Sequence, residues 1–124
     1  MANSLGEVFI LKTTDRATGV PALLNKLSLD DYSGKQVALK ANYNSADLFP
    51  ASTHLDTLRT IVVKLKGAGA SGITLAERSG MGDTEQVLEQ MGVLALSKEL
   101  GFKAVVLNDV SKEDWLKVER GGTR

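Results

Sequence analysis

Four short apolar runs alternate with segments whose apolar residues repeat at helical spacing, and this order constrains the fold most strongly. The runs lie at residues 8–12, 36–40, 73–76 and 104–107, each about as long as a strand that is buried on both faces. Amphipathic helices between such strands carry the chain back to begin the next parallel strand. We therefore predict one α/β domain over residues 1–124, a Rossmann-like three-layer sandwich of four mostly parallel strands alternating with helices.

The segments between the runs carry helix signals. The second segment has an apolar stripe at helical spacing, formed by Leu55, Leu58, Val62 and Leu65. Thr53 and Asp56 stand just before and within this stripe at the spacing of a capping box, with Asp in place of the usual Glu. Asp83 and Gln86 have the same spacing before the next stripe, which Gly92 interrupts. We expect Thr53 and Asp83 to begin these two helices.

A glycine-rich stretch matches the pattern of dinucleotide-binding sites. Residues 67–72 read Gly-Ala-Gly-Ala-Ser-Gly, and that motif requires a strand before it and a helix after it. Here a predicted helix precedes the glycines and a predicted strand follows them. We therefore interpret the stretch as a helix end and a tight turn.

The composition excludes several classes of function. The chain has no cysteine, so it holds no iron–sulfur cluster, thiolate zinc site or disulfide, and its cofactors are otherwise unknown. Its 15 basic and 15 acidic residues give a formal net charge of zero, which predicts no nucleic-acid partner. Near-zero charge does little to keep copies apart, so we expect a homo-oligomer.

The order of residues predicts neither a signal peptide nor a membrane-spanning segment. Its first residues lack a basic region followed by a long apolar run, and no apolar stretch reaches membrane-spanning length. We expect a cytoplasmic location and no membrane partner.

Polar residues gather after the carboxyl ends of the predicted strands, where ligands bind to open parallel sheets. After the second strand, Lys40, Asn42 and Asn44 occupy alternate positions. In an extended segment such residues share a face, so a cation and two amides could converge on a carboxylate or phosphate. The alternative interpretation is that the asparagines satisfy turns and Lys40 points to solvent.

A second group of polar residues, Ser52, Thr53 and His54, precedes the second predicted helix. His54 is the only histidine and could act as a general base or as a single metal ligand. One histidine gives no ligand spacing, so we predict no metal site. The alternative is that this group only starts the helix, with Thr53 as the cap.

The loop after the third predicted strand has the order strand, glycines, helix. It contains Glu77, Arg78, Ser79 and Gly80. Glycine lets a ligand approach the backbone, and Arg78 could clamp an anion. Glu77 would repel a phosphate, which favours a ligand that carries a divalent cation. The alternative is that Asp83 simply caps the following helix.

The same stretches resemble a known family, the domain of unknown function 362. The resemblance lies in residues 9–16, 37–44, 50–58 and 76–80. It implies no reaction, because the activity of the family is unassigned, and its members are often fused to ferredoxin-type iron–sulfur modules. Ala41 stands where the family usually has the proline of Lys-Pro-Asn.

The family domain continues beyond the point where this chain stops. We therefore expect either the N-terminal half of a longer domain or a naturally short form. A half domain would leave a sheet edge or apolar surface exposed, and dimerisation could cover it.

Two functions from different classes remain. The first is binding of a small anionic ligand or a metal chelate at the carboxyl ends of the strands, with or without catalysis; its catalytic residues are unknown and its binding residues are Lys40, Asn42, Asn44, Ser52, Thr53, His54, Glu77, Arg78, Ser79 and Gly80. This first function requires Lys40 and Arg78 to lie on the same face, within about 15 Å of each other. The alternative is a non-catalytic accessory or assembly module that acts through oligomerisation.

Overall fold

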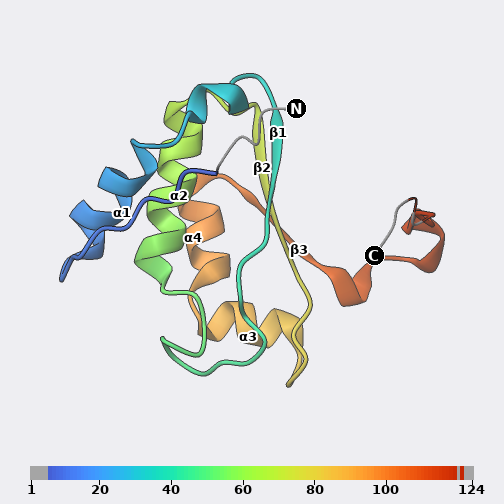
Figure 1. The fold of residues 1–124 in the computed structure, drawn as a ribbon. Coiled ribbons are helices and arrows are strands. Elements are labelled where there is room, and N and C mark those ends of the chain that lie inside the picture. The colour runs from blue at the N-terminus through green and yellow to red at the C-terminus, as the bar shows by residue number, and fades with distance from the viewer. Residues whose placement is uncertain (1–5, 120, 122–124) are drawn as a thin grey trace.

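The computed structural model describes residues 6–119 and 121, and Figure 1 shows their arrangement. Three strands form one parallel sheet in the order β1-β2-β3, with Val37 opposite Ile73 and Leu75 opposite Ala104. The strands are β1 Gln36–Leu39, β2 Gly72–Glu77 and β3 Lys103–Val106. The α/β class and the parallel sheet are therefore confirmed.

Among the described residues, one α-helix precedes the sheet and three lie between its strands. They are α1 Arg16–Leu24, α2 Leu55–Gly67, α3 Thr84–Gln90 and α4 Val93–Leu100; three short 3-10 helices are η1 Leu29–Tyr32, η2 Leu107–Asp109 and η3 Lys112–Asp114. None of the described helices is long and apolar enough to cross a membrane. The tight turn predicted after α2 is confirmed, with Gly69 at a φ of 85° between the helix and β2. Gly92, at a φ of 76°, separates α3 from α4 as predicted.

The apolar run at residues 8–12 is not a strand, so the prediction of four strands is wrong for the described residues. Val8 and Ile10 are 82% and 91% exposed, and the run lies beside Leu23 of α1 rather than along the sheet. An apolar run records a tendency to be buried. A strand also needs an edge that accepts its backbone hydrogen bonds, and no strand pairs with this run.

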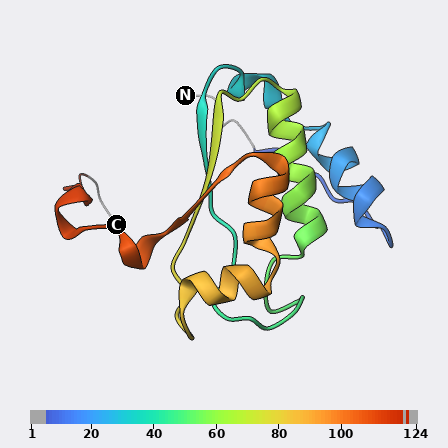
Figure 2. The ribbon, with the colours of Figure 1, turned by 180° about the vertical axis from the view of Figure 1, so that it is seen from behind.

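The helices cover one face of the sheet, as both views show (Figures 1 and 2). The described residues therefore form two layers, not the three that were predicted. Along β2, Ile73 and Leu75 are buried toward the helices, whereas Thr74 and Ala76 are partly exposed. We call the uncovered side the open face; its positions, which alternate with the core-facing ones, are Gln36, Ala38, Thr74, Ala76, Lys103 and Val105.

The core lies between the sheet and the helices. Its sheet side consists of Val37, Ile73 and Leu75. Its helix side consists of Leu58, Val62, Leu65, Val87, Leu88, Val93 and Leu96. Burial of this shared face fixes α2 and α4 against the strands, and it holds the loops that follow β1 and β2 next to each other.

Candidate functional site

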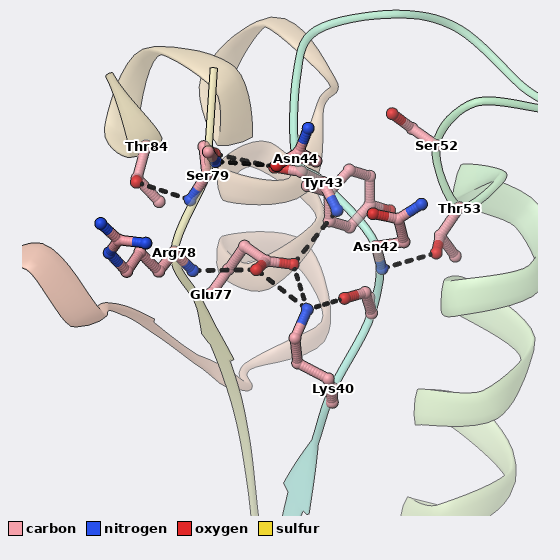
Figure 3. A network of polar contacts seen from close by, with 12 residues as sticks. Lys40, Asn42, Tyr43, Asn44, Ser52, Thr53, Glu77, Arg78, Ser79 and Thr84 are labelled. Atoms are coloured by element: carbon pink, nitrogen blue, oxygen red, sulfur yellow. Dashed lines mark hydrogen bonds and ion pairs between the residues drawn. The ribbon is translucent and has the colours of Figure 1, made fainter. Parts of the chain in front are cut away.

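Glu77 joins the loops that follow β1 and β2 (Figure 3). Side-chain alternation along β2 places it on the core-facing side with Ile73 and Leu75, and it is 2% exposed. Its carboxylate accepts hydrogen bonds from Lys40 Nζ at 2.8 and 2.9 Å. It also accepts the backbone N–H groups of Tyr43 at 3.1 Å and Arg78 at 2.8 Å. A buried carboxylate is costly unless it is satisfied in this way.

Lys40 meets Glu77 from the solvent side. Its side chain is 69% exposed whereas that of Glu77 is 3% exposed. Lys40 Nζ also donates to the carbonyl of Ala41, at the base of the same loop. Water screens the exposed partner of this ion pair. The backbone donors therefore carry much of the stabilisation of the Glu77 charge.

A second set of contacts joins the same two loops. Ser79 Oγ donates to the carbonyl of Tyr43 at 2.7 Å, and the Ser79 N–H donates to Thr84 Oγ1 at 3.0 Å. The Gly80 N–H donates to Asn44 Oδ1 at 2.9 Å. A Cβ at position 80 would collide with this oxygen, so glycine admits the Asn44 side chain. We call the contacts between residues 40–44 and 77–80 the latch.

The remaining polar residues fold the long loop after β1 onto itself. Thr53 Oγ1 accepts the N–H of Asn42 at 2.9 Å, and the Thr53 N–H donates to the carbonyl of Asn42 at 2.9 Å. Asn42 Nδ2 donates to the carbonyl of Ala51 at 2.9 Å. Ser52 is buried, and its Oγ donates to the carbonyl of Ser45 at 3.2 Å. These contacts bring the start of α2 close to the end of β1.

His54, not Thr53, begins α2. Its Nδ1 accepts the N–H of Asp56 at 3.2 Å. The capping prediction for Thr53 is wrong because its hydroxyl is already taken by the loop. The His54 ring also packs edge-on against Phe49, with ring centroids 5.7 Å apart. A ring that accepts at Nδ1 carries its proton at Nε2 when neutral.

Asp83 does begin α3 as predicted, because its carboxylate accepts the N–H of Gln86 at 2.9 Å. Arg78 is exposed, and within the described residues its guanidinium makes no hydrogen bond or ion pair. In Figure 3 its side chain extends away from Lys40. Lys40, Asn44, Glu77, Ser79 and Gly80 thus meet in the latch, while Arg78 points outward.

Tyr43 is the residue of this region that the sequence reasoning missed. It is fully buried, and its hydroxyl finds no hydrogen-bond partner among the described residues. Burial, and secondarily the charge of Glu77, raises the pKa of its hydroxyl to about 12. The available signal was the alternation of Asn42, Tyr43 and Asn44, which sends the middle side chain to the opposite face.

The latch has few groups left for a ligand. A cavity of about 170 Å³ lies at the start of α2 and is lined by Leu48, Phe49, Thr53, His54, Leu55, Gln90 and Met91. Small-molecule sites are usually about 300 Å³ or larger. No group of three potential metal-ligating side chains occurs among residues 6–119 and 121.

Comparison with known proteins identifies a family but no characterised relative. The model of the family described as Domain of unknown function (DUF362) matches residues 37–124, which confirms the resemblance seen in the sequence. The matched span begins in β1 and contains the whole latch. No curated protein and no solved structure gives a significant match.

Proposed function

We propose that this chain, which belongs to the Domain of unknown function (DUF362) family, is an assembly module that binds another polypeptide on its open face. One observation carries the proposal. The sheet is entirely parallel, yet helices cover only one side of it. Parallel sheets in proteins are almost always covered on both faces, because their strands are apolar on both sides.

The exposed area supports the binding of a partner. The chain exposes 9324 Å², whereas a compact monomer of its mass exposes about 6,400 Å². Large apolar side chains contribute to the surplus, among them Val8, Ile10, Leu48, Met81, Trp115, Leu116 and Val118. A stable interface buries only about 800 Å² per partner. A layer bound to the open face would complete the three-layer sandwich expected from the sequence.

The latch supports assembly rather than catalysis. Its side chains satisfy one another and hold the ends of β1 and β2 together, beside the open face. A rigid surface loses little conformational freedom when it binds a partner. The polar residues after these strands would then serve to fix the shape of the module.

The test is a charge placed on the open face. Val105→Lys, on β3, should remove the partner from protein purified from its source and analysed by native mass spectrometry. Val63→Lys, on the outer surface of α2 where Val63 is 51% exposed, is the matched control and should retain it. Circular dichroism checks that both variants fold. The proposal is contradicted if the wild-type chain from its source is a monomer at every concentration and carries no bound polypeptide.

A second candidate function is binding of a small anion, and the exposed cations favour it. Lys40 and Arg78 lie at the ends of adjacent strands, and only the Lys40 charge is paired within the described residues. Arg78 would bind the anion, while Lys40 and the asparagines Asn42 and Asn44 would line the same edge of the sheet.

Calorimetric titration with inorganic phosphate and pyrophosphate tests this second function. Arg78→Gln should weaken binding at least about tenfold, since a charged hydrogen bond contributes about 1.5–3 kcal/mol. Arg59→Gln is the control, because Arg59 is already paired with Glu99 on the helical side. Absence of binding to the wild-type chain at millimolar anion would exclude this function.

A further inference from the structure

We propose that the open face is covered by a second copy of this chain, whose residues 110–118 pack across it in a reciprocal exchange. This inference rests on the proposed assembly function and names its partner. It follows from two surfaces of one chain, a projecting segment with exposed apolar side chains and an uncovered sheet face, that lie on the same side of the molecule.

The projecting segment, residues 110–118, carries three exposed apolar side chains among polar ones. Trp115, Leu116 and Val118 are 54%, 89% and 81% exposed. The backbone hydrogen bonds of the segment are local, such as Asp114 N–H to the carbonyl of Ser111 at 3.0 Å. After β3 the chain turns at η2 and runs outward on the uncovered side of the sheet (Figures 1 and 2). The segment therefore runs away from the open face of its own chain.

The open face suits such a segment in shape and charge. Three of its positions, Ala38, Thr74 and Ala76, carry small side chains, so a partner backbone can approach the strands closely there. Lys103 is exposed and pairs in register with Thr74 at the edge of this face. Residues 110–118 carry two acidic and two basic side chains, namely Glu113, Asp114, Lys112 and Lys117. The segment is neutral overall, and Glu113 or Asp114 can supply a carboxylate for an ion pair with Lys103.

A second copy is the partner that these surfaces favour. Each chain offers both the segment and the face, so a twofold arrangement satisfies both at once and closes the assembly at two copies. A formal net charge of zero leaves no overall repulsion between copies. The exposed surplus exceeds the roughly 800 Å² per chain that a stable dimer requires.

The chain has one tryptophan and no cysteine, so two specific probes are available. Trp115 fluorescence reports burial of the segment. An Ala76→Cys variant gives a unique thiol whose labelling rate reports cover of the open face. Both are measured over a dilution series, with the mass followed by analytical ultracentrifugation.

We expect a dimer with blue-shifted Trp115 emission. Labelling at position 76 should be slowed about fivefold when the total concentration is ten times the Kd, as mass action requires. Both effects should be lost on dilution. Leu116→Asp should give a monomer, whereas Leu48→Asp, at a leucine that is 77% exposed in the loop after β1, should leave the dimer intact.

Three results would overturn the inference, and they have different meanings. A monomer with rapid labelling refutes the second copy but leaves the open face free for another protein. A monomer with slow labelling and buried Trp115 shows that the segment folds back on its own sheet, and then the assembly function fails too. A dimer with rapid labelling shows that the copies meet elsewhere.

Discussion

Replacing Glu77 by Gln tests whether the latch is a main source of stability. The carboxylate accepts two backbone N–H groups, those of Tyr43 and Arg78, through different oxygens, and it also accepts Lys40 Nζ. Gln has one carbonyl oxygen and one NH2 group. One of the two backbone donors would therefore face another donor at a site that is 2% exposed.

The expected loss follows from these contacts. A buried donor left without an acceptor costs about 1–3 kcal/mol, and the remaining hydrogen bond becomes neutral and so weaker. Glu77→Gln should lower the free energy of unfolding by roughly 2–4 kcal/mol. Lys40→Met should cost only about 1 kcal/mol, because it removes an ion pair whose cation is largely exposed and leaves both backbone donors in place.

Urea denaturation followed by circular dichroism measures both losses. Glu99→Gln is the matched control, since Glu99 is 55% exposed and pairs with Arg59 on the surface, and it should leave the stability close to that of the wild type. The reasoning is refuted if Glu77→Gln lies within about 0.5 kcal/mol of wild type. It is also refuted if Lys40→Met costs as much as Glu77→Gln.

Three further outcomes are expected. Tyr43→Phe should raise the free energy of unfolding by about 1 kcal/mol in urea, because it removes a buried hydroxyl without a partner; a loss of stability would mean that this hydroxyl is bonded in solution. Because the pKa of Tyr43 is raised from 10.0 to about 12, the folded state favours the protonated hydroxyl. The contribution of Tyr43 to the free energy of unfolding should therefore be constant below pH 10 and fall between pH 10 and 12, by at most about 1.4 kcal/mol per pH unit. The Tyr43→Phe variant should lack this pH dependence. His54→Ala should lower stability by about 0.5–2 kcal/mol through loss of the α2 cap, whereas His54→Asn should retain most of it in thermal denaturation.

The sequence predicted the features that depend on neighbouring residues. Apolar spacing indicated α2, α4 and all three strands of the sheet, and Asp83 was correctly placed at the start of α3. The order of helix and strand around residues 67–72 was also predicted correctly, with α2 before the glycines and β2 after them. Each of these depends on backbone geometry within a few residues, which local side chains control.

Only the tertiary structure decided which contacts the site residues make. Glu77 contacts Lys40 and Tyr43, which lie 37 and 34 residues away in the sequence. The hydroxyl of Thr53 accepts the N–H of Asn42 and does not cap α2. The run at residues 8–12 has strand composition but pairs with none of the described strands. The sequence located the polar residues after β1 and β2. It did not predict that their side chains hydrogen-bond to one another, or that one face of the sheet is uncovered. A periodic pattern states that one face of an element will be buried, whereas the partner that buries it is chosen by packing and hydrogen bonding across the whole chain.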